Sequence, residues 1–301
     1  MKLWIAVVAF ASIAGVAAAD ELEDSYTKLK DAVARKDAAA VKTAAAETLK
    51  LARAAENAAK PAEADQQEHW KQSVEYGKEV ESYTEYALAA TAQAGVEPAK
   101  TADLIDTLIA QNAKSKYLDD AAVTAYWSAL SKPGDAAKLT AGMTKILGGH
   151  PDQTVALLVM VQASASSPDR ALNYANKLIA AEKTKAKPEG VSEADFDKAR
   201  NAALSTGYFT AGYVYLQKQA WVDCDRDMKA AVPLLTGDSE RLGTAYFALG
   251  VCNFSLGKMT NDRTKMQAGE KYSEQSAAIK SRVQNQAYNN VASMKQALGG
   301  R

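Results

Sequence analysis

The sequence predicts an all-α fold, built as a solenoid of antiparallel helix pairs. The first observation is a pattern that repeats in three segments: Gly207-Tyr208-Phe209-Thr210-Ala211-Gly212, Ala245-Tyr246-Phe247-Ala248-Leu249-Gly250 and Ala287-Tyr288-Asn289-Asn290-Val291-Ala292. Their last residues lie 38 and 42 residues apart, which is the length of one helix pair with a loop. The second is that prolines recur at spacings of 35 and 37 residues. The third is that alanine and charged helix formers dominate the sequence, while residues that favour strands are sparse. A single pair cannot bury its apolar face alone, so successive pairs are expected to stack.

Proline positions divide the chain into segments of helical length. Proline lacks a backbone donor and disfavours helix in the residue before it, so prolines 61, 98, 133, 151, 168, 188 and 233 mark helix boundaries. Turn sequences such as Lys132-Pro133-Gly134-Asp135 end one helix and supply an acidic residue to begin the next. The predicted helices cover residues 21–35, 37–59, 63–94, 99–113, 118–131, 134–147, 152–164, 168–184, 192–218, 220–235, 239–256, 265–280 and 282–298.

Residues 1–19 have the pattern of a secretory signal peptide. Basic Lys2 is followed by an apolar run from Leu3 to Val16, and Ala17-Ala18-Ala19 supplies small residues before Asp20. This order matches the positive region, apolar region and cleavage site of such signals. An uncleaved N-terminal anchor is the alternative, although spans usually need about 20 apolar residues. We expect cleavage after Ala19 and export to the periplasm or the medium, with no membrane span in the mature protein.

The charge balance argues against nucleic-acid and membrane-surface partners, and the two cysteines leave open whether a disulfide forms. The chain has 36 Lys and Arg against 36 Asp and Glu, so without Lys2 the formal charge is −1. This balance predicts neither a nucleic-acid footprint nor a strongly basic membrane-binding surface. Cys224 and Cys252 are the only cysteines and fall on neighbouring predicted helices. An exported protein meets an oxidising compartment, so they form either a disulfide or two small buried thiols.

The C-terminal half resembles the tetratricopeptide repeat (TPR) family. The residues that carry the resemblance are, for one copy, Tyr208, Ala211, Gly212, Tyr215, Cys224, Met228 and Ala231, and for the next, Tyr246, Leu249, Gly250, Gly257, Ala268 and Tyr272. Tyr288, Val291 and Ala292 open a last helix without a partner, as in a terminal cap. Asn253 departs from the pattern, and an insertion at Met259–Lys265 is expected to lengthen one turn. The resemblance implies a right-handed solenoid, with irregular repeats over 20–187 and more regular ones over 188–301.

The resemblance also implies a binding face on the first helix of each pair. It comprises Trp127, Phe209, Tyr213, Phe247, Val251, Phe254 and Asn289. Phe209 and Tyr213 are four residues apart, as are Phe247 and Val251, so each pair shares a helix face. Such a groove suits an apolar or extended peptide. The alternative is that these aromatic residues fill the cores between repeats.

No motif of an active site or a cofactor site is recognisable. His69 and His150 lack metal-ligand spacing, and we interpret them as surface or turn residues. Asp223, Asp225 and Asp227 imitate the start of a calcium loop but lack its glycine and final acid, so we interpret them as a solvated face. The sequence therefore predicts a non-catalytic interaction scaffold that binds a protein or peptide without a cofactor. A small-ligand or substrate-binding helical module is the first alternative, and an enzyme on a helical scaffold is the second.

Overall fold

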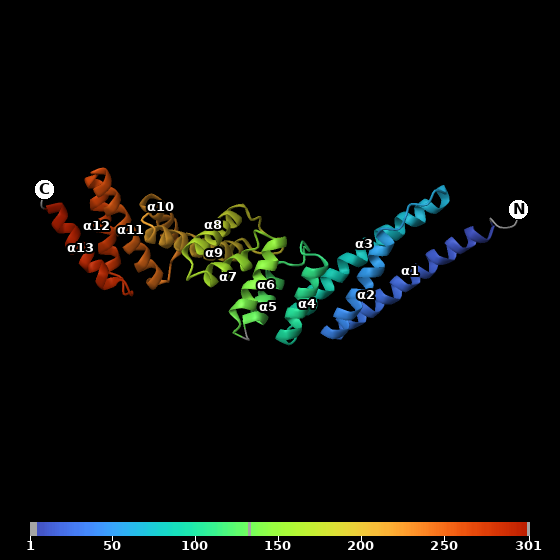
Figure 1. Ribbon diagram of the computed structural model, residues 1–301. Helices are drawn as coiled ribbons and strands as arrows, with labels where there is room; N and C mark the ends of the chain where they lie inside the picture. Colours follow the sequence, from blue (N-terminus) through green and yellow to red (C-terminus); the bar gives the residue numbers. More distant parts are fainter. Residues whose placement is uncertain (1–4, 132–133, 300–301) are drawn as a thin grey trace. The chain divides into compact units, whose positions relative to one another are not determined.

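The structure is a computed structural model that describes residues 5–131 and 134–299. Within these residues it holds thirteen α-helices and no strand, which confirms the all-α prediction (Figure 1). The helices are α1 (Ile5–Ala34), α2 (Ala38–Glu56), α3 (Ala64–Gln93), α4 (Pro98–Gln111), α5 (Asp120–Ser131), α6 (Ala136–Gly149), α7 (Thr154–Ala163), α8 (Pro168–Thr184), α9 (Glu193–Gln217), α10 (Trp221–Ala231), α11 (Ser239–Thr260), α12 (Arg263–Ala277) and α13 (Gln284–Gly299). A short 3₁₀ turn, Val232–Leu234, follows α10.

Acidic and hydroxyl side chains begin many of these helices. Asp37, Asp135, Ser192, Asp238 and Asp262 each accept a hydrogen bond from a backbone N–H in the first turn of the following helix. These bonds satisfy donors that have no partner inside the helix, so the chain leaves each turn at a defined residue. Pro98 and Pro168 begin α4 and α8 at the first helical position, as the sequence predicts.

Most predicted boundaries lie within four residues of those in the structure, but the start of α1 and the α11–α12 turn differ from the prediction. Helix α1 begins at Ile5, well before the predicted start at residue 21, and no proline interrupts the run between them. The expected long turn over Met259–Lys265 is wrong, because α11 continues to Thr260 and α12 starts at Arg263. Asn261 adopts a left-handed conformation with φ of 53°, so the chain reverses over two residues. The additional residues lengthen the helices rather than the turn.

The chain forms two compact units, which divide between Pro151 and Asp152. The sequence placed its division between residues 187 and 188. That segment instead connects α8 and α9 inside the second unit, where the two helices pack against each other. Arg200 Nε donates a hydrogen bond to the Glu182 carbonyl at 2.9 Å and so ties the two helices together. The stretch from Lys183 to Ser192 is therefore a loop between packed helices, the alternative that its composition also allowed.

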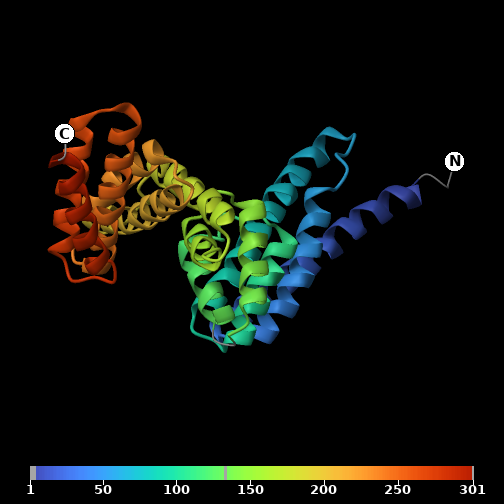
Figure 2. The ribbon, with the colours of Figure 1, turned by 60° about the vertical axis from the view of Figure 1, so that its left-hand side comes forward.

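In the first unit, each helix packs against the next one along the chain and against the next but one. Figure 2 shows α1, α2 and α3, in blue, lying together. Leu22, Ala52 and Val80 form a buried cluster between them. The buried Glu85 carboxylate of α3 accepts hydrogen bonds from Asn112 Nδ2 at 2.8 Å and Ser115 Oγ at 2.7 Å. These bonds satisfy the charge and fix the turn after α4 against α3.

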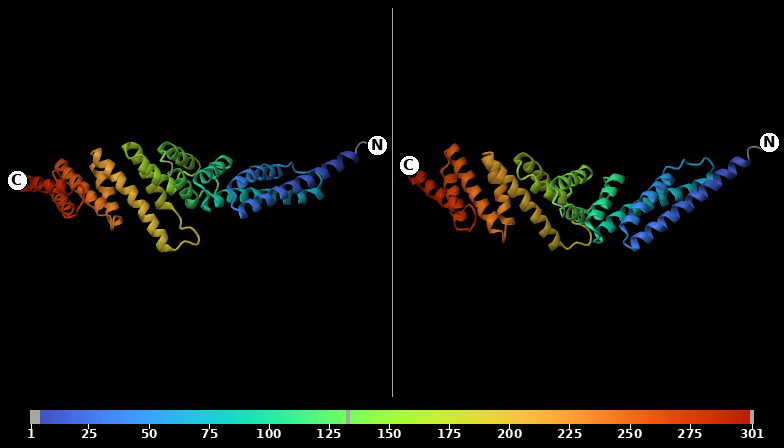
Figure 3. Two further views of the ribbon diagram at one scale, coloured as in Figure 1. Left: turned by 90° about the horizontal axis from the view of Figure 1, so that it is seen from below. Right: turned by 60° about the horizontal axis from the view of Figure 1, so that its bottom comes forward.

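The second unit is centred on the contact between α10 and α11. Its buried cluster comprises Cys224, Met228, Ala231, Leu235, Ala245, Ala248, Leu249 and Cys252. The small residues at which the sequence expects close helix packing, Ala211, Gly212, Leu249 and Gly250, are all buried. A Cβ added at Gly212 would lie 2.8 Å from Met228 Cγ, so α9 and α10 approach closely at this point. Helix α12 lies beside both α11 and α13 (Figure 1 and Figure 3).

The closest helix contact, between α11 and α12, has a register that the sequence did not predict. Ala268 was assigned to this contact, but it is only half-buried. The neighbouring Gly269 makes the contact instead. A Cβ built on Gly269 would lie 2.6 Å from Phe254 N and 2.8 Å from Gly250 O. Only a glycine lets two backbones approach this closely, so Gly269 determines the distance between α11 and α12.

Candidate partner-binding site

The second unit carries an open hollow of about 440 Å³ on the surface of its first helices. Its lining residues come from α9, from the first turns of α11, and from the turn before α13 together with the start of that helix. They are Phe209, Tyr213, Glu240, Arg241, Thr244, Arg282, Val283 and Gln286. The hollow therefore lies where three successive first helices of the predicted pairs meet, and it combines aromatic with charged groups.

Two aromatic rings from α9 form one side of the hollow. Phe209 and Tyr213 lie one helical turn apart, and their rings stack with centroids 6.4 Å apart and planes inclined by 12°. Phe209 is half-buried and packs against the α10–α11 core, whereas Tyr213 is 41% exposed. The Arg241 guanidinium lies 6.0 Å from the centre of the Phe209 ring, on the other side of the hollow. Tyr213 is thus the ring that a partner can reach without disturbing the core.

The charged side chains of the hollow are held in ion pairs. Arg282 donates from its Nε to Glu240 Oε1 at 2.7 Å and from its backbone N to Glu240 Oε2 at 3.1 Å. These bonds from Arg282 lower the pKa of the Glu240 carboxyl below its usual value. Arg241 bonds Asp238 in the same way, through its backbone N at 2.9 Å and its Nε at 2.6 Å, and this lowers the Asp238 pKa. Both carboxylates therefore remain charged at neutral pH, and each is paired with a guanidinium group.

Of the predicted binding residues, only Phe209 and Tyr213 line this hollow. Phe247 and Val251 are half-buried and share a helix face with Thr244, but they lie further along α11. The contact of Gly269 with Phe254 N and Cβ places Phe254 at the packing between α11 and α12.

The other two predicted residues, Asn289 and Trp127, lie apart from the hollow. Asn289 is exposed on α13. Trp127 is 38% exposed and belongs to α5 of the first unit. The motif alignment pairs Phe209 with Phe247, whereas the structure places Phe209 beside Arg241 and Thr244.

Sequence reasoning missed the charged half of the hollow. Thr244 lies three residues before the predicted Phe247, and Arg241 lies three residues before Thr244, so helical periodicity places Thr244 beside each of them, although Arg241 and Phe247 themselves point about 120° apart. No comparable signal exists for Arg282, which lies in the turn before α13 and reaches the hollow through the packing of α12 and α13.

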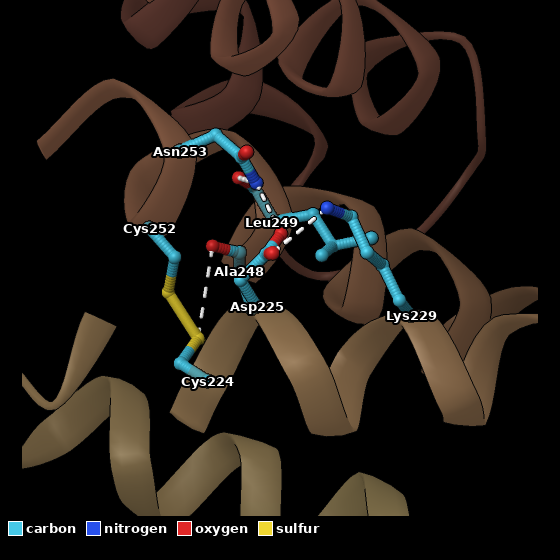
Figure 4. Close-up of a disulfide and its surroundings, with 7 residues drawn as sticks. All are labelled: Cys224, Asp225, Lys229, Ala248, Leu249, Cys252 and Asn253. Atoms are coloured by element: carbon cyan, nitrogen blue, oxygen red, sulfur yellow. Dashed lines mark hydrogen bonds and ion pairs between the residues drawn. A yellow bond between two sulfur atoms is a disulfide. The ribbon is translucent and has the colours of Figure 1, made fainter. Parts of the chain in front are cut away.

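A disulfide joins α10 and α11 (Figure 4). Cys224 and Cys252 are both fully buried, with Cα atoms 6.5 Å apart. Beside the bond, Asn253 Nδ2 donates to Asp225 Oδ1 at 2.6 Å, and Lys229 Nζ lies 2.7 Å from Asp225 Oδ2. Asn253, which departs from the repeat pattern, thus links the two helices by a second, polar contact.

The interpretation of Asp223, Asp225 and Asp227 as a solvated face is wrong for Asp227, whereas the Asp223 side chain is 42% exposed and that of Asp225 is 21% exposed. Asp227 is buried and pairs with Arg226 Nε at 2.7 Å, and Arg226 Nη1 lies 2.8 Å from Asp223. Burial of Asp227 is compatible with its charge because the guanidinium beside it makes two hydrogen bonds to it. Asp223 and Asp227 therefore form ion pairs within α10, and Asp225 also links α10 to α11 through Asn253.

Further comparisons concern metal ions, membranes and known proteins. In the described ranges, no group of three or more His, Cys, Asp or Glu side chains is placed to hold a metal ion. Among the helices of residues 5–131 and 134–299, none is long and apolar enough to cross a membrane. No protein-family model matches the chain, and no curated protein is significantly similar to it.

Proposed function

We propose that this protein is a non-catalytic interaction scaffold of the cell envelope. Its helix pairs stack as a right-handed, TPR-like solenoid, and the surface of α9, α11 and α13 holds a segment of a partner protein. In the first unit each helix packs against the next one and against the next but one, and in the second unit α7, α9, α11 and α13 contact one another in succession, which supports stacking within each unit. A Tyr-x-x-x-small pattern recurs within α9, α11 and α13, from Tyr208 to Gly212, Tyr246 to Gly250 and Tyr288 to Ala292, and supports the likeness to TPR proteins.

The observation that carries the proposal is the hollow with the exposed Tyr213 beside the Arg282–Glu240 ion pair. Exposed tyrosine and arginine are typical anchors of protein interfaces, because one end of each side chain packs while the other forms hydrogen bonds. The ion pairs already hold the charged groups in place, so binding costs little side-chain entropy. A partner segment that carries an apolar residue next to polar groups fits this surface.

Replacing Tyr213 by alanine tests the proposal. We expect partner binding to weaken by about 1 to 3 kcal/mol, the range of interface anchors, with little loss of stability because the side chain is 41% exposed. The partner is first identified by placing a photo-crosslinking amino acid at position 213 in cells, followed by mass spectrometry. Calorimetry with the purified partner then measures the change in affinity.

Tyr288→Ala is the matched control. Tyr288 is 56% exposed on α13 and does not line the hollow, so its replacement should leave affinity unchanged. Phe209→Ala should behave differently again, because this ring packs against the core and its loss costs about 3 to 5 kcal/mol of folding stability. Equal affinities of wild type and Tyr213→Ala would contradict the proposed site.

A second candidate function is the binding of a small ligand in the same hollow. Its volume of about 440 Å³ lies within the range of ordinary ligand sites. A thermal shift with metabolites, without capture of any protein at position 213, favours this function over the scaffold.

We further propose that the protein acts after export. The order of Lys2, the apolar run and Ala17-Ala18-Ala19 supports this proposal. N-terminal sequencing of protein from the periplasm or the medium should then begin at Asp20. Protein that retains Met1 and stays in the membrane fraction would contradict it.

A further inference from the structure

Five tyrosines form a continuous row of ring contacts in the first unit. The ring centroids are 6.3 Å apart for Tyr76 and Tyr26, 5.1 Å for Tyr26 and Tyr83, 5.8 Å for Tyr83 and Tyr86, and 5.7 Å for Tyr86 and Tyr117. We call this row the tyrosine ladder. Aromatic rings in edge-on and tilted contact attract one another, so these contacts favour one arrangement of the rings.

Helical periodicity and one buried cluster position the ladder. Tyr76 and Tyr83 are seven residues apart on α3, with Glu79 between them, so all three share one face. Tyr26 of α1 lies between the two rings, and both Tyr26 and Tyr76 pack against the buried Leu22–Ala52–Val80 cluster. Tyr86, further along the ladder, is 45% exposed. The ladder is thus held by the packing of Tyr26 and Tyr76 against the buried cluster, and its Tyr86 ring is accessible to solvent.

The ladder already has cations placed over two of its rings. Lys30 Nζ lies 4.2 Å from the centre of the Tyr26 ring, and Lys116 Nζ lies 5.0 Å from the centre of the Tyr117 ring. Both distances are within the range of cation–π attraction. The electron-rich faces in this row therefore accept ammonium groups, while Tyr86 has no lysine or arginine over its ring among the residues that the structure describes.

The two helices that carry most of the ladder are acidic. Residues 20–31 of α1 contain five acidic and two basic side chains, and residues 63–85 contain seven acidic and two basic ones. Glu23, which accepts the Tyr76 hydroxyl hydrogen bond, and Glu79 form no ion pair within the described part of the chain. Burial, followed by the charges of Glu23 and Glu79, raises the pKa of Tyr26, so both carboxylates act directly on the ladder. The surface is therefore complementary to positive charge.

We propose that the tyrosine ladder binds a lysine- or arginine-bearing segment of a partner protein. One cationic side chain of that segment lies over the open Tyr86 ring, and the carboxylates of Glu23 and Glu79 attract the others. A carbohydrate is the other class of ligand that stacks on tyrosine rings, but it does not use the negative charge of α1 and α3. This surface lies in the first unit, so it is independent of the hollow in the second.

The test uses the full chain and a fluorescent synthetic peptide of about twelve alternating lysine and glycine residues. Anisotropy should show binding of this peptide and none of the same peptide with norleucine at each lysine. Tyr86→Leu keeps an apolar side chain but removes the ring, and it should weaken binding about three- to thirty-fold. Glu79→Gln should weaken it as well and reduce its dependence on salt, because one charge is lost.

Trp127→Leu is the matched control, since it removes an exposed ring from α5 of the same unit and should leave peptide affinity unchanged. Thermal melting confirms that each variant is folded, and Tyr86→Met, which also removes the ring but keeps a large apolar side chain, replaces Tyr86→Leu if that variant melts early. Absence of binding by the lysine peptide overturns the proposal. Equal affinities of folded Tyr86→Leu and wild type also overturn it, since charge alone would then explain the binding. Binding of a glucose oligosaccharide in place of the peptide assigns the ladder to carbohydrate and overturns it too.

Discussion

Replacing Gly269 by alanine is expected to destabilise the second unit by about 3 kcal/mol, at the upper end of the cost of overpacking. The new methyl group would lie 2.6 Å from Phe254 N and 2.8 Å from Gly250 O, and both are backbone atoms of α11 that cannot rotate away. Helices α11 and α12 must therefore separate, which loosens the contact along their whole length. Denaturant unfolding followed by the fluorescence of Trp221, the one tryptophan of the second unit and a neighbour of its core, measures the loss.

Gly148→Ala is the matched control and should raise stability instead of lowering it. Gly148 is also helical, but a Cβ built on it meets no atom within 4 Å. Alanine there should stabilise the first unit by about 0.5 to 1 kcal/mol, because it lowers the entropy of the unfolded chain without a clash. If Gly269→Ala shifted the denaturation midpoint of the second unit as little as this control shifts that of the first, the close approach of α11 and α12 would be wrong.

Removing the disulfide by the double replacement of Cys224 and Cys252 with alanine should cost the second unit about 3 to 4 kcal/mol. The bond closes a loop between residues 28 apart, and a loop of this size restricts the unfolded chain by about that amount of free energy. Both sites are fully buried in the α10–α11 core, so the lost sulfur atoms also leave unfilled space. The two helices keep their polar link through Asn253 and Asp225, and the fold itself should survive.

The same unfolding experiment with and without a reducing agent isolates the effect of the bond. The reductant should lower the midpoint of the wild type and leave the double variant unchanged. An equal shift in both proteins, or none in either, would show that a Cys224–Cys252 disulfide does not contribute to stability.

The local part of the fold could be predicted because it depends on neighbouring residues in the chain. Pro98 and Pro168 begin helices, and Asp135 caps α6, through effects that act within one helical turn. The small residues of the repeated pattern, such as Gly250, are buried as expected. The same local reasoning was wrong for the α11–α12 turn, where Asn261 alone reverses the chain.

Contacts between helices could be predicted only in part. Helical periodicity identified Phe209 and Tyr213 as one face, and both line the hollow. It did not predict that Gly269, rather than Ala268, meets α11, since adjacent residues on a helix differ by about 100° in direction and both are small. Nor did it predict that Arg241 lies beside the Phe209 ring.

By itself, therefore, the sequence determined the helical class, the order of the helices and some of the residues that face a neighbouring helix. These follow from backbone propensity, capping and the periodicity of apolar residues, which are properties of short segments. Tertiary structure alone decided the disulfide, the burial of Asp227 and the ion pair between Arg282 and Glu240, which line the hollow. Each depends on the distance and stagger between helices far apart in the sequence, and many side chains determine that packing jointly.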